Sequence, residues 1–471
     1  MKNTFVIVLI LFLTANFAFS QGTEIKIKFR TFKNNEVYLG FHYGKDKYIR
    51  DTAKVDNKGI VVFSDKLKEI PGGIYLLITP DLNYFEFILA ESKVVLETDT
   101  GDFVKNMKVI ESEENKIFFN YLKFIETKQK EKDIIAKEKA IYSSDEMKSA
   151  EYDLKLKAID EEVKKNIDDL VKNNPGKFFP KLLKMMDEPE MRDKKPEETD
   201  SAYSVYIYNH FQFHYFDNVD FSDNKILRTP VYAPKIDRFL ENYTMYHPDS
   251  IKVSAARIID KSQANDEVFK FTLVRIFNRY ANSEYMGMDA VFVYLAEKYY
   301  LSGLATWADS AQLAKIYDRV VKMSSNLIGM KAPELIMKDT NENYHSLHSQ
   351  KAKYTILVFW EPNCGHCAKA IPHLQRIWET MPADSFKIYA VNIGNDGKEW
   401  QKFLIDNKIT FLNVWDPFNY NNFRVLYDIF SSPVVYLLDE NKKIVAKRIG
   451  VDKIQEVVDV LEERSKPANN K

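Results

Sequence analysis

The chain has only two cysteines, Cys364 and Cys367, and one glycine and one histidine separate them. Two thiols at this spacing can alternate between a dithiol and a disulfide, because one sulfur attacks a substrate disulfide and the other resolves the mixed disulfide. The attacking group is the thiolate, so the chemistry needs surroundings that lower the pKa of one thiol. His366, between the cysteines, is a candidate source of positive charge for that purpose.

Two other interpretations of the cysteine pair are weaker. A structural disulfide would close a loop of only four residues, and loop-closure entropy gives such a loop roughly 2 kcal/mol against nearly 5 kcal/mol for about 100 residues. A structural zinc ion needs four ligands, and here only His366 and His373 lie close in sequence, with no second cysteine pair. We therefore predict a redox-active pair, with no metal ion and no cofactor.

The segments around the cysteines predict how they are positioned. Residues 354–360 are an apolar run typical of a buried strand, and residues 367–380 have a helical pattern. Cys364 therefore lies at a helix N-terminus, where free N–H groups and the helix dipole stabilise a thiolate and lower its pKa from about 8.5 toward 3.5–7.5. Further strands are expected at residues 386–393, 434–438 and 444–447, which gives this part of the chain an alternating β/α order.

Several short motifs in this region share a family pattern. They are Val358-Phe359-Trp360, Cys364-Gly365-His366-Cys367, Pro372 in the predicted helix, Ser432-Pro433 before an apolar strand, and the segment Met330 to Leu335. Together they resemble the thioredoxin superfamily, and specifically the secreted TlpA/ResA-like thiol–disulfide oxidoreductases and related redoxins. The resemblance implies that Cys364 attacks, that Cys367 resolves, and that Pro433 is the cis-proline that faces them. Residues 394–417 resemble the helix and strand that this branch inserts into the thioredoxin core.

Two positions depart from the family pattern. Val358 stands where thioredoxins carry a buried acid, and Ala370 stands where many TlpA/ResA-like proteins have glutamate. These departures leave the proton acceptor for Cys367 open. Glu361, three residues before Cys364, is our substitute, and the alternative is that it is an exposed loop carboxylate. A peroxiredoxin would have threonine at the position of Glu361 before a single peroxidatic cysteine, so that reading is weaker.

The N-terminus has the pattern of a secretory signal peptide over residues 1–20. Lys2 gives a positive start, residues 5–13 are an unbroken apolar run, and Ala18-Phe19-Ser20 supplies small residues for cleavage. The apolar run is shorter than the roughly 20 residues of a membrane-spanning helix, which argues against an uncleaved anchor. We expect a periplasmic protein with no transmembrane segment in the mature chain.

The hydrophobic pattern changes twice along the mature chain. Residues 21–105 alternate with period two between turn signals, which predicts an antiparallel β-sandwich-like domain. Residues 112–325 have helical periodicity interrupted by prolines, which predicts an all-α domain of several helices. Residues 328–465 form the predicted thioredoxin-like α/β domain. The first two regions resemble two uncharacterised domains that are found ahead of thioredoxin-like domains in secreted bacterial proteins.

Composition limits the partners. The chain has 67 basic and 68 acidic residues among 471, so its net charge of −1 does not indicate nucleic-acid binding. We expect substrate protein disulfides and a membrane thiol–disulfide electron donor as partners. The predicted function is a periplasmic TlpA-type disulfide reductase. The alternatives are an oxidase or isomerase direction, and a partner-binding scaffold whose redox centre is incidental.

Overall fold

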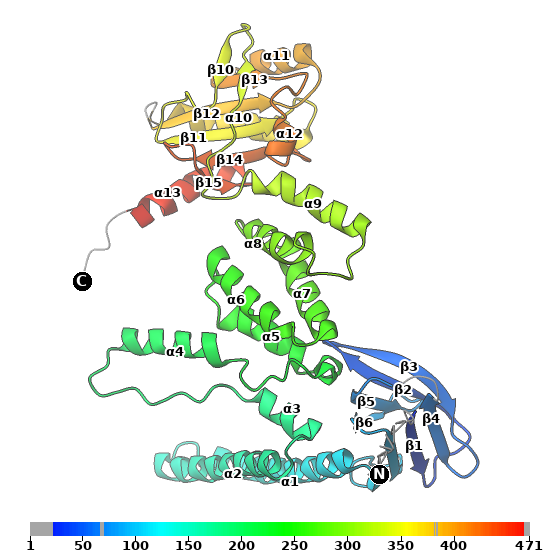
Figure 1. Cartoon of the computed structure of the whole chain (residues 1–471). Coiled ribbons are helices and arrows are strands. Elements are labelled where there is room, and N and C mark those ends of the chain that lie inside the picture. The colour runs from blue at the N-terminus through cyan, green and yellow to red at the C-terminus, as the bar shows by residue number, and fades with distance from the viewer. Residues whose placement is uncertain (1–21, 66–69, 381, 383–384, 466–471) are drawn as a thin grey trace, which may run out of the picture. The chain divides into compact units, whose positions relative to one another are not determined.

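The computed structural model describes residues 22–65, 70–380, 382 and 385–465 (Figure 1). The predicted signal peptide therefore lies outside the described residues. The chain forms two compact units: one runs to Phe239 and includes Gln263–Val268, and the other contains Leu240–Ser262 and the chain from Phe269 onward. In the described residues, no helix combines the length and the apolar character that crossing a membrane requires.

The first unit begins with two sheets of four strands, in the orders β4-β1-β7-β8 and β3-β2-β5-β6. Most strand pairs are antiparallel, but β1 and β7 are parallel. Along β1, buried apolar residues alternate with less buried polar ones, as the sequence pattern predicts, and β2 follows a similar alternation of burial. The strands are β1 (Thr23–Phe29), β2 (Glu36–Tyr43), β3 (Asp46–Lys54), β4 (Ile60–Asp65), β5 (Gly73–Ile78), β6 (Tyr84–Leu89), β7 (Lys93–Thr98) and β8 (Lys108–Glu111).

Helices fill the middle of the chain. Ser112 caps the first of them, because its hydroxyl accepts a hydrogen bond from the N–H of Asn115 at 3.1 Å. The first two helices are long and are joined by ion pairs such as Lys128–Glu162. The helices are α1 (Glu113–Ile141), α2 (Glu146–Asn173), α3 (Phe178–Met186), α4 (Asp200–His214), α5 (Tyr232–Asn242), α6 (Pro248–Ser262), α7 (Asp266–Ala281), α8 (Asp289–Leu295) and α9 (Ser310–Ser324).

The C-terminal region is a mixed sheet of seven strands in the order β10-β9-β13-β12-β11-β14-β15. Strand β11 lies near the centre, parallel to β12 and antiparallel to β14. The elements are β9 (Ile336–Lys338), β10 (Tyr344–Ser346), β11 (Tyr354–Trp360), α10 (Gly365–Thr380), β12 (Phe386–Asn392), α11 (Gly397–Asp406), β13 (Leu412–Trp415), α12 (Phe423–Leu426), β14 (Val434–Leu438), β15 (Ile444–Lys447) and α13 (Ile454–Ser465). The predicted multidomain fold class, with β, helical and thioredoxin-like α/β parts, is confirmed.

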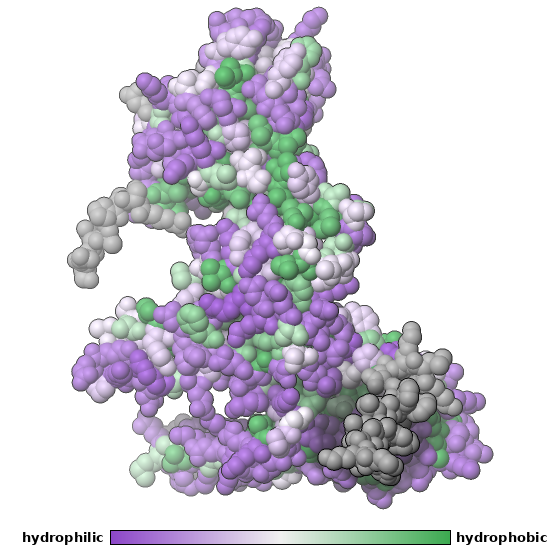
Figure 2. Space-filling view, viewed as in Figure 1, coloured by the Kyte–Doolittle hydropathy of each residue, from purple (hydrophilic) through white to green (hydrophobic). Residues whose placement is uncertain are grey.

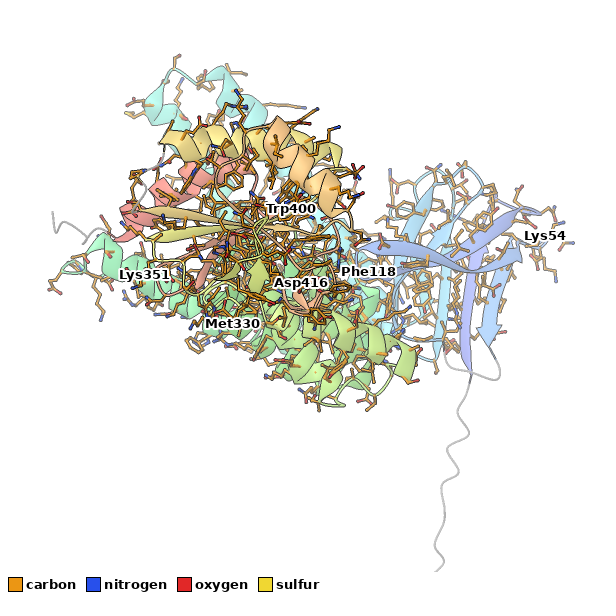
Figure 3. All side chains as sticks on the ribbon, turned by 90° about the horizontal axis from the view of Figure 1, so that it is seen from above. Lys54, Phe118, Met330, Lys351, Trp400 and Asp416 are labelled. Atoms are coloured by element: carbon orange, nitrogen blue, oxygen red, sulfur yellow. The ribbon has the colours of Figure 1, made fainter. Side chains whose placement is uncertain are left out.

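The two faces of this sheet have separate hydrophobic cores. Ile356, Val358 and Trp360 of β11 pack in one core with residues of α10, α11 and α13. Leu357 and Phe359 pack in the other, with residues of α12 and of the segment before β11. Trp400 belongs to the first core and lies between α11, which carries it, and the sheet (Figure 3). This alternation explains why every residue of β11 is buried.

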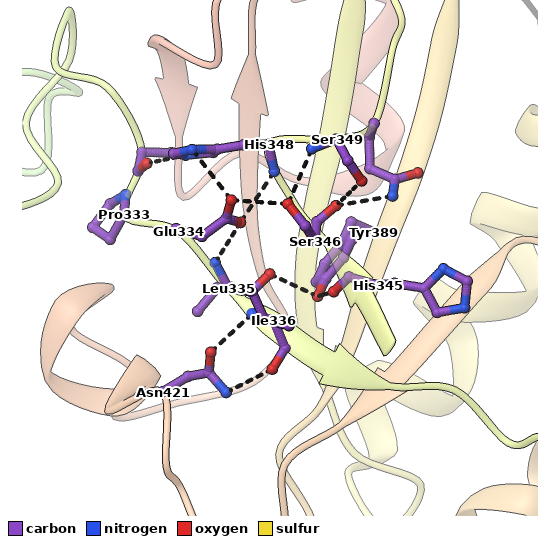
Figure 4. Close-up of polar contacts among 12 residues, drawn as sticks. Pro333, Glu334, Leu335, Ile336, His345, Ser346, His348, Ser349, Tyr389 and Asn421 are labelled. Atoms are coloured by element: carbon purple, nitrogen blue, oxygen red, sulfur yellow. Dashed lines mark hydrogen bonds and ion pairs between the residues drawn. The ribbon is translucent and has the colours of Figure 1, made fainter. Parts of the chain in front are cut away.

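A polar network attaches the segment before β11 to the sheet (Figure 4). The Glu334 carboxylate accepts hydrogen bonds from the Ser346 hydroxyl at 2.8 Å and from the His348 N–H at 3.1 Å. The Tyr389 hydroxyl of β12 donates to the carbonyl oxygen atoms of Leu335 and His345. These bonds satisfy polar groups at the edge of the second core, so the segment is a structural part of the sheet.

Within the second unit, hydrophobic residues gather in a band over α12 and α9 (Figure 2). The two helices are in contact, and Tyr317 and Val321 of α9 are exposed. The hydroxyl of Ser325, just after α9, donates a hydrogen bond to the carbonyl oxygen of Leu426 at 2.9 Å. The end of the helical region is therefore bonded directly to the thioredoxin-like part.

Candidate functional site

The fold places Cys364 immediately before α10 and Cys367 in its first turn. The Cys367 N–H donates a hydrogen bond to the Cys364 sulfur at 3.4 Å, as expected for a thiol at a helix N-terminus. Cys364 is half-buried, whereas Cys367 is fully buried, and the two thiols are not joined in a disulfide. An incoming disulfide can therefore reach Cys364 more readily than Cys367.

The surroundings give the two thiols opposite acidities. Burial would raise the pKa of Cys364, but hydrogen bonds from the Cys367 and Ser432 side chains and from the Cys367 and His366 backbones outweigh burial, so the pKa lies below its ordinary value. Burial, aided by the hydrogen bond with Cys364, raises the pKa of Cys367 to about 12. Cys364 therefore forms a thiolate more readily than Cys367, which stays protonated. Disulfide exchange uses this difference, because the first thiol attacks as a thiolate and the second reacts only afterwards.

The segment before β14 contacts Cys364 from outside α10. The Cys364 thiol donates a hydrogen bond to the carbonyl oxygen of Ser432 at 3.3 Å. The Ser432–Pro433 peptide bond is cis, and both residues are half-buried. The structure thus brings Pro433, which the sequence singled out, next to the cysteine pair.

Glu361 is connected to the same segment. Its Oε1 accepts a hydrogen bond from the Ser432 hydroxyl at 3.0 Å, and its carbonyl oxygen accepts one from the Cys364 N–H at 3.4 Å. A backbone hydrogen bond from Glu361 also acts on Cys367, where it partly offsets the rise in pKa. Glu361 is half-buried in the site, so it is more than an exposed loop carboxylate.

His366 is exposed in the first turn of α10. That its imidazole supplies charge near the thiolate remains a prediction. Its backbone N–H is the group that contributes to the lowered pKa of Cys364. A helix start supplies such N–H groups whatever the side chain, and they add to the larger effect of the hydrogen bonds with the Cys367 and Ser432 side chains on the pKa of Cys364.

The positions where the family carries acids are apolar here. Val358 is fully buried in the same core as Cys367, and Ala370 packs against that core. Charge that develops on Cys367 therefore has no acid beside it in β11. Ser432 is the site residue that sequence reasoning noted only as the neighbour of Pro433. Its hydroxyl donates to Glu361, its carbonyl oxygen accepts from the Cys364 thiol, and its place before the proline was the available signal.

Within the described ranges, no three His, Cys, Asp or Glu side chains are grouped so that they could hold a metal ion.

Comparison with known proteins assigns each region to a family. Residues 328–447 match the AhpC/TSA family, residues 198–326 match a domain of unknown function (DUF5106), and residues 23–118 match another (DUF4369).

Curated relatives match the C-terminal region. The chain is 31% identical over 121 residues to sporulation thiol-disulfide oxidoreductase A of Bacillus subtilis (strain 168), covering 25% of this chain and 72% of that protein. It is 26% identical over 117 residues to the thiol-disulfide oxidoreductase ResA of Geobacillus thermodenitrificans (strain NG80-2), covering 25% of this chain and 66% of the relative. Among solved structures, a domain of a possible thiol-disulfide isomerase from Cytophaga hutchinsonii is 43% identical, with a TM-score of 0.28, covering 29% of this chain and 95% of that domain.

Proposed function

Because this chain belongs to the thioredoxin-like thiol–disulfide oxidoreductases of the AhpC/TSA family, we propose that it is a periplasmic, TlpA-type reductase of protein disulfides. Its redox centre is Cys364-Gly365-His366-Cys367. The observation that carries the proposal is the contrast between a half-buried Cys364 with a lowered pKa and a buried Cys367 with a raised pKa.

The reaction begins at Cys364. Its thiolate attacks one sulfur of a substrate disulfide, a bond forms between the two sulfurs, and the other substrate sulfur leaves as a thiolate. Cys367 then loses its proton and attacks the sulfur of Cys364, which releases the reduced substrate and leaves a Cys364–Cys367 disulfide. The closeness of the two sulfurs supports this second step, since the Cys367 N–H already bonds to Cys364.

Glu361 is our proposed proton acceptor for the second step. Its carboxylate accepts the Ser432 hydroxyl proton in a hydrogen bond, and Ser432 in turn interacts with both thiols. A proton from Cys367 can therefore move toward Glu361 through the serine hydroxyl. In thioredoxins a buried acid stands at the position of Val358, which is in the hydrophobic core here. The route through Ser432 would take the place of that acid.

We propose the reducing direction because the surroundings of the cysteine pair resemble those of TlpA/ResA-like proteins. Reduction potentials in this superfamily extend from about −270 mV for thioredoxin to about −120 mV for DsbA. We expect a value nearer the thioredoxin end, and measurement of the potential of the Cys364–Cys367 couple tests this. A membrane thiol–disulfide donor would then return the oxidised pair to the dithiol.

Insulin reduction tests this function. Protein that begins at Gln21 and extends to the C-terminus should accelerate the reduction of insulin by dithiothreitol, whereas the Cys364→Ser variant should match the rate without protein. The Tyr317→Ala variant, which changes an exposed side chain of α9, is a control and should keep the wild-type rate. A wild-type rate equal to that of Cys364→Ser would favour the scaffold alternative and remove the reductase proposal.

A further inference from the structure

The second unit contains a cavity of about 400 Å³ between the thioredoxin-like sheet and the helices that precede it. Phe430, Lys447 and Arg448 line it from the sheet side. Tyr285 and Met286 line it from the segment before α8, and Met323 lines it from α9. The backbone N–H of Lys447 contacts the Met286 sulfur at 3.4 Å, so the two sides are in direct contact.

One wall residue of the cavity lies close in sequence to the reactive site. Phe430 is two residues before Ser432, whose carbonyl oxygen accepts the hydrogen bond from Cys364. Two residues of extended chain span at most about 7 Å, so the backbone of Phe430 lies within that distance of the backbone of Ser432. A side chain a few residues from the attacked cysteine of a substrate has the length to cover such a distance.

The charges around the cavity cancel in pairs. Lys447 is paired with Asp289, and Arg448 is paired with Asp428 at 2.8 Å. The remaining charged groups at the wall are Glu284 and Arg319, one of each sign, so the cavity offers no net charge to a ligand. A charged side chain would lose its water without compensation there, whereas an apolar one would not.

The walls suit a large apolar group. Phe430 and Tyr285 are 75% and 68% exposed, with Arg448 over one face of the Phe430 ring and Tyr246 against the Tyr285 ring, so part of each ring is open to an incoming ligand. Met286 and Met323 add flexible thioether side chains, which adapt to ligands of different shape and contact aromatic rings favourably. Exposed apolar groups of this kind, gathered beside a reactive centre, are typical of a recognition surface.

We propose that this cavity binds a large apolar side chain of the substrate polypeptide, two to four residues from the cysteine that Cys364 attacks. The inference rests on the proposed function and deepens it, because it gives the helical part of the second unit a role in choosing substrates. The preferred substrate segment is extended, uncharged near its disulfide, and carries a phenylalanine or a similar residue.

Single-turnover kinetics with pre-reduced protein that begins at Gln21 tests the proposal. The substrates are symmetric disulfide dimers of decapeptides with one cysteine, serine at the other variable positions, and one phenylalanine moved from four residues before to four residues after the cysteine. Cys364 attacks either identical sulfur, one peptide thiol leaves, and Cys367 releases the second while the protein becomes oxidised. At least one phenylalanine position should lower the half-saturating concentration about ten-fold relative to the all-serine peptide.

Two variants separate the cavity from the reactive centre. The Tyr285→Ala/Met286→Ala protein removes one wall, and Met323→Trp fills the space. Each should abolish the ten-fold preference while its rate with oxidised glutathione, which is too small to span the distance, stays within about two-fold of wild type. Tyr317→Ala, on α9 but outside the cavity lining, should retain the preference.

Three results would overturn the inference. If all peptides had the same half-saturating concentration and were turned over normally, the cavity would have no role in substrate binding, and the reductase function would stand. A preference that survives both variants would place the binding elsewhere. Failure of wild type to reduce both the peptides and oxidised glutathione would remove the proposed function itself, and the inference with it.

Discussion

At the scale of single residues, the site combines features that sequence spacing predicts with features that it does not. Two cysteines at a helix start predict one accessible, acidic thiol, and the half-buried Cys364 with its lowered pKa agrees with that expectation. The bond between Ser432 and Glu361 was not predictable, because the two residues are separated by 71 positions and neither has a motif of its own. The proposed reaction uses both kinds of feature.

The different acidities of the two thiols predict a selective reaction with iodoacetamide. As pH rises through the lowered pKa of Cys364, its thiolate fraction and its alkylation rate should rise and level off at a lower pH than for an ordinary cysteine. Cys367, with a pKa of about 12, should stay unmodified over this range. Peptide mapping of reduced protein checks both statements. Labelling of Cys367 before Cys364 at neutral pH would reverse the proposed assignment.

The proposed proton route predicts a defined effect of Glu361→Gln. Glutamine keeps an acceptor for the Ser432 hydroxyl but removes the basic carboxylate, so resolution by Cys367 should slow about 10–100-fold at pH 7. Attack by Cys364 should change less than about three-fold, because the helix start and Ser432 are retained. Stopped-flow measurement of mixed-disulfide formation and decay separates the two steps.

Glu399→Gln is the matched control for this prediction. Glu399 is an exposed acid that accepts a hydrogen bond from Asn363 near the site. Both rates should stay at the wild-type level in this variant. An equal slowing of resolution in Glu361→Gln and Glu399→Gln would mean that local charge, and no specific route through Ser432, sets the rate.

At the scale of elements, apolar periodicity marks strands whose residues are buried. Strand β11 was predicted as a buried strand and all its residues are buried, whereas the residues of β3 are almost all exposed and have no apolar alternation to mark them. The parallel pairing of β1 with β7 could not be predicted from the sequence either, because strands that pair across a long sequence separation leave no local signal. The domain boundaries inferred from the change of period remain predictions.

The junction between the first sheets and α1 gives a prediction about stability. Asn115 is fully buried, and its side chain donates to the carbonyl oxygen of Ile88 at 2.7 Å and accepts from the Ile88 N–H at 2.8 Å. Asn115→Ala leaves both backbone groups unpaired, so the free energy of unfolding should fall by about 2–5 kcal/mol. Urea unfolding followed by circular dichroism measures the loss.

Asn35→Ala serves as the control for this junction. Asn35 is exposed, and its side chain bonds only to the nearby carbonyl oxygen of Lys33 among the hydrogen bonds of the described residues. Its removal should change the free energy of unfolding by less than about 0.5 kcal/mol. An equal loss of unfolding free energy in the two variants would show that the hydrogen bonds of Asn115 do not stabilise the contact between α1 and β6.

At the scale of the molecule, a buried ion pair within the second unit joins the helical region to the thioredoxin-like sheet. Lys447 at the end of β15 is paired with Asp289 at the start of α8, and its ammonium also donates to the side-chain and backbone oxygen atoms of Asn326 at 2.8 and 2.9 Å. Burial lowers the pKa of Lys447, while Asp289 opposes that change. Sequence analysis could not find this pair, because neither residue belongs to a recognisable motif.

Removal of one partner of this pair should be costly. Asp289→Ala leaves the Lys447 charge buried without its carboxylate, so the free energy of unfolding of the second unit should fall by about 3–5 kcal/mol. The double variant Asp289→Ala/Lys447→Met removes the charge as well and should recover most of that loss. Thermal unfolding of the three proteins checks the order. A double variant as unstable as Asp289→Ala would mean that the charge is not the cause.

The order of attack is the central claim, and trapping of mixed disulfides tests it most directly. Cys367→Ser should remove resolution and leave attack intact, so it should accumulate covalent complexes with substrate proteins in the cell that dithiothreitol releases. Cys364→Ser should trap almost nothing, because Cys367 is buried and its pKa is about 12. We predict a large excess of complexes with Cys367→Ser on non-reducing gels, and equal yields from the two variants would contradict the assignment of Cys364 as the attacking thiol.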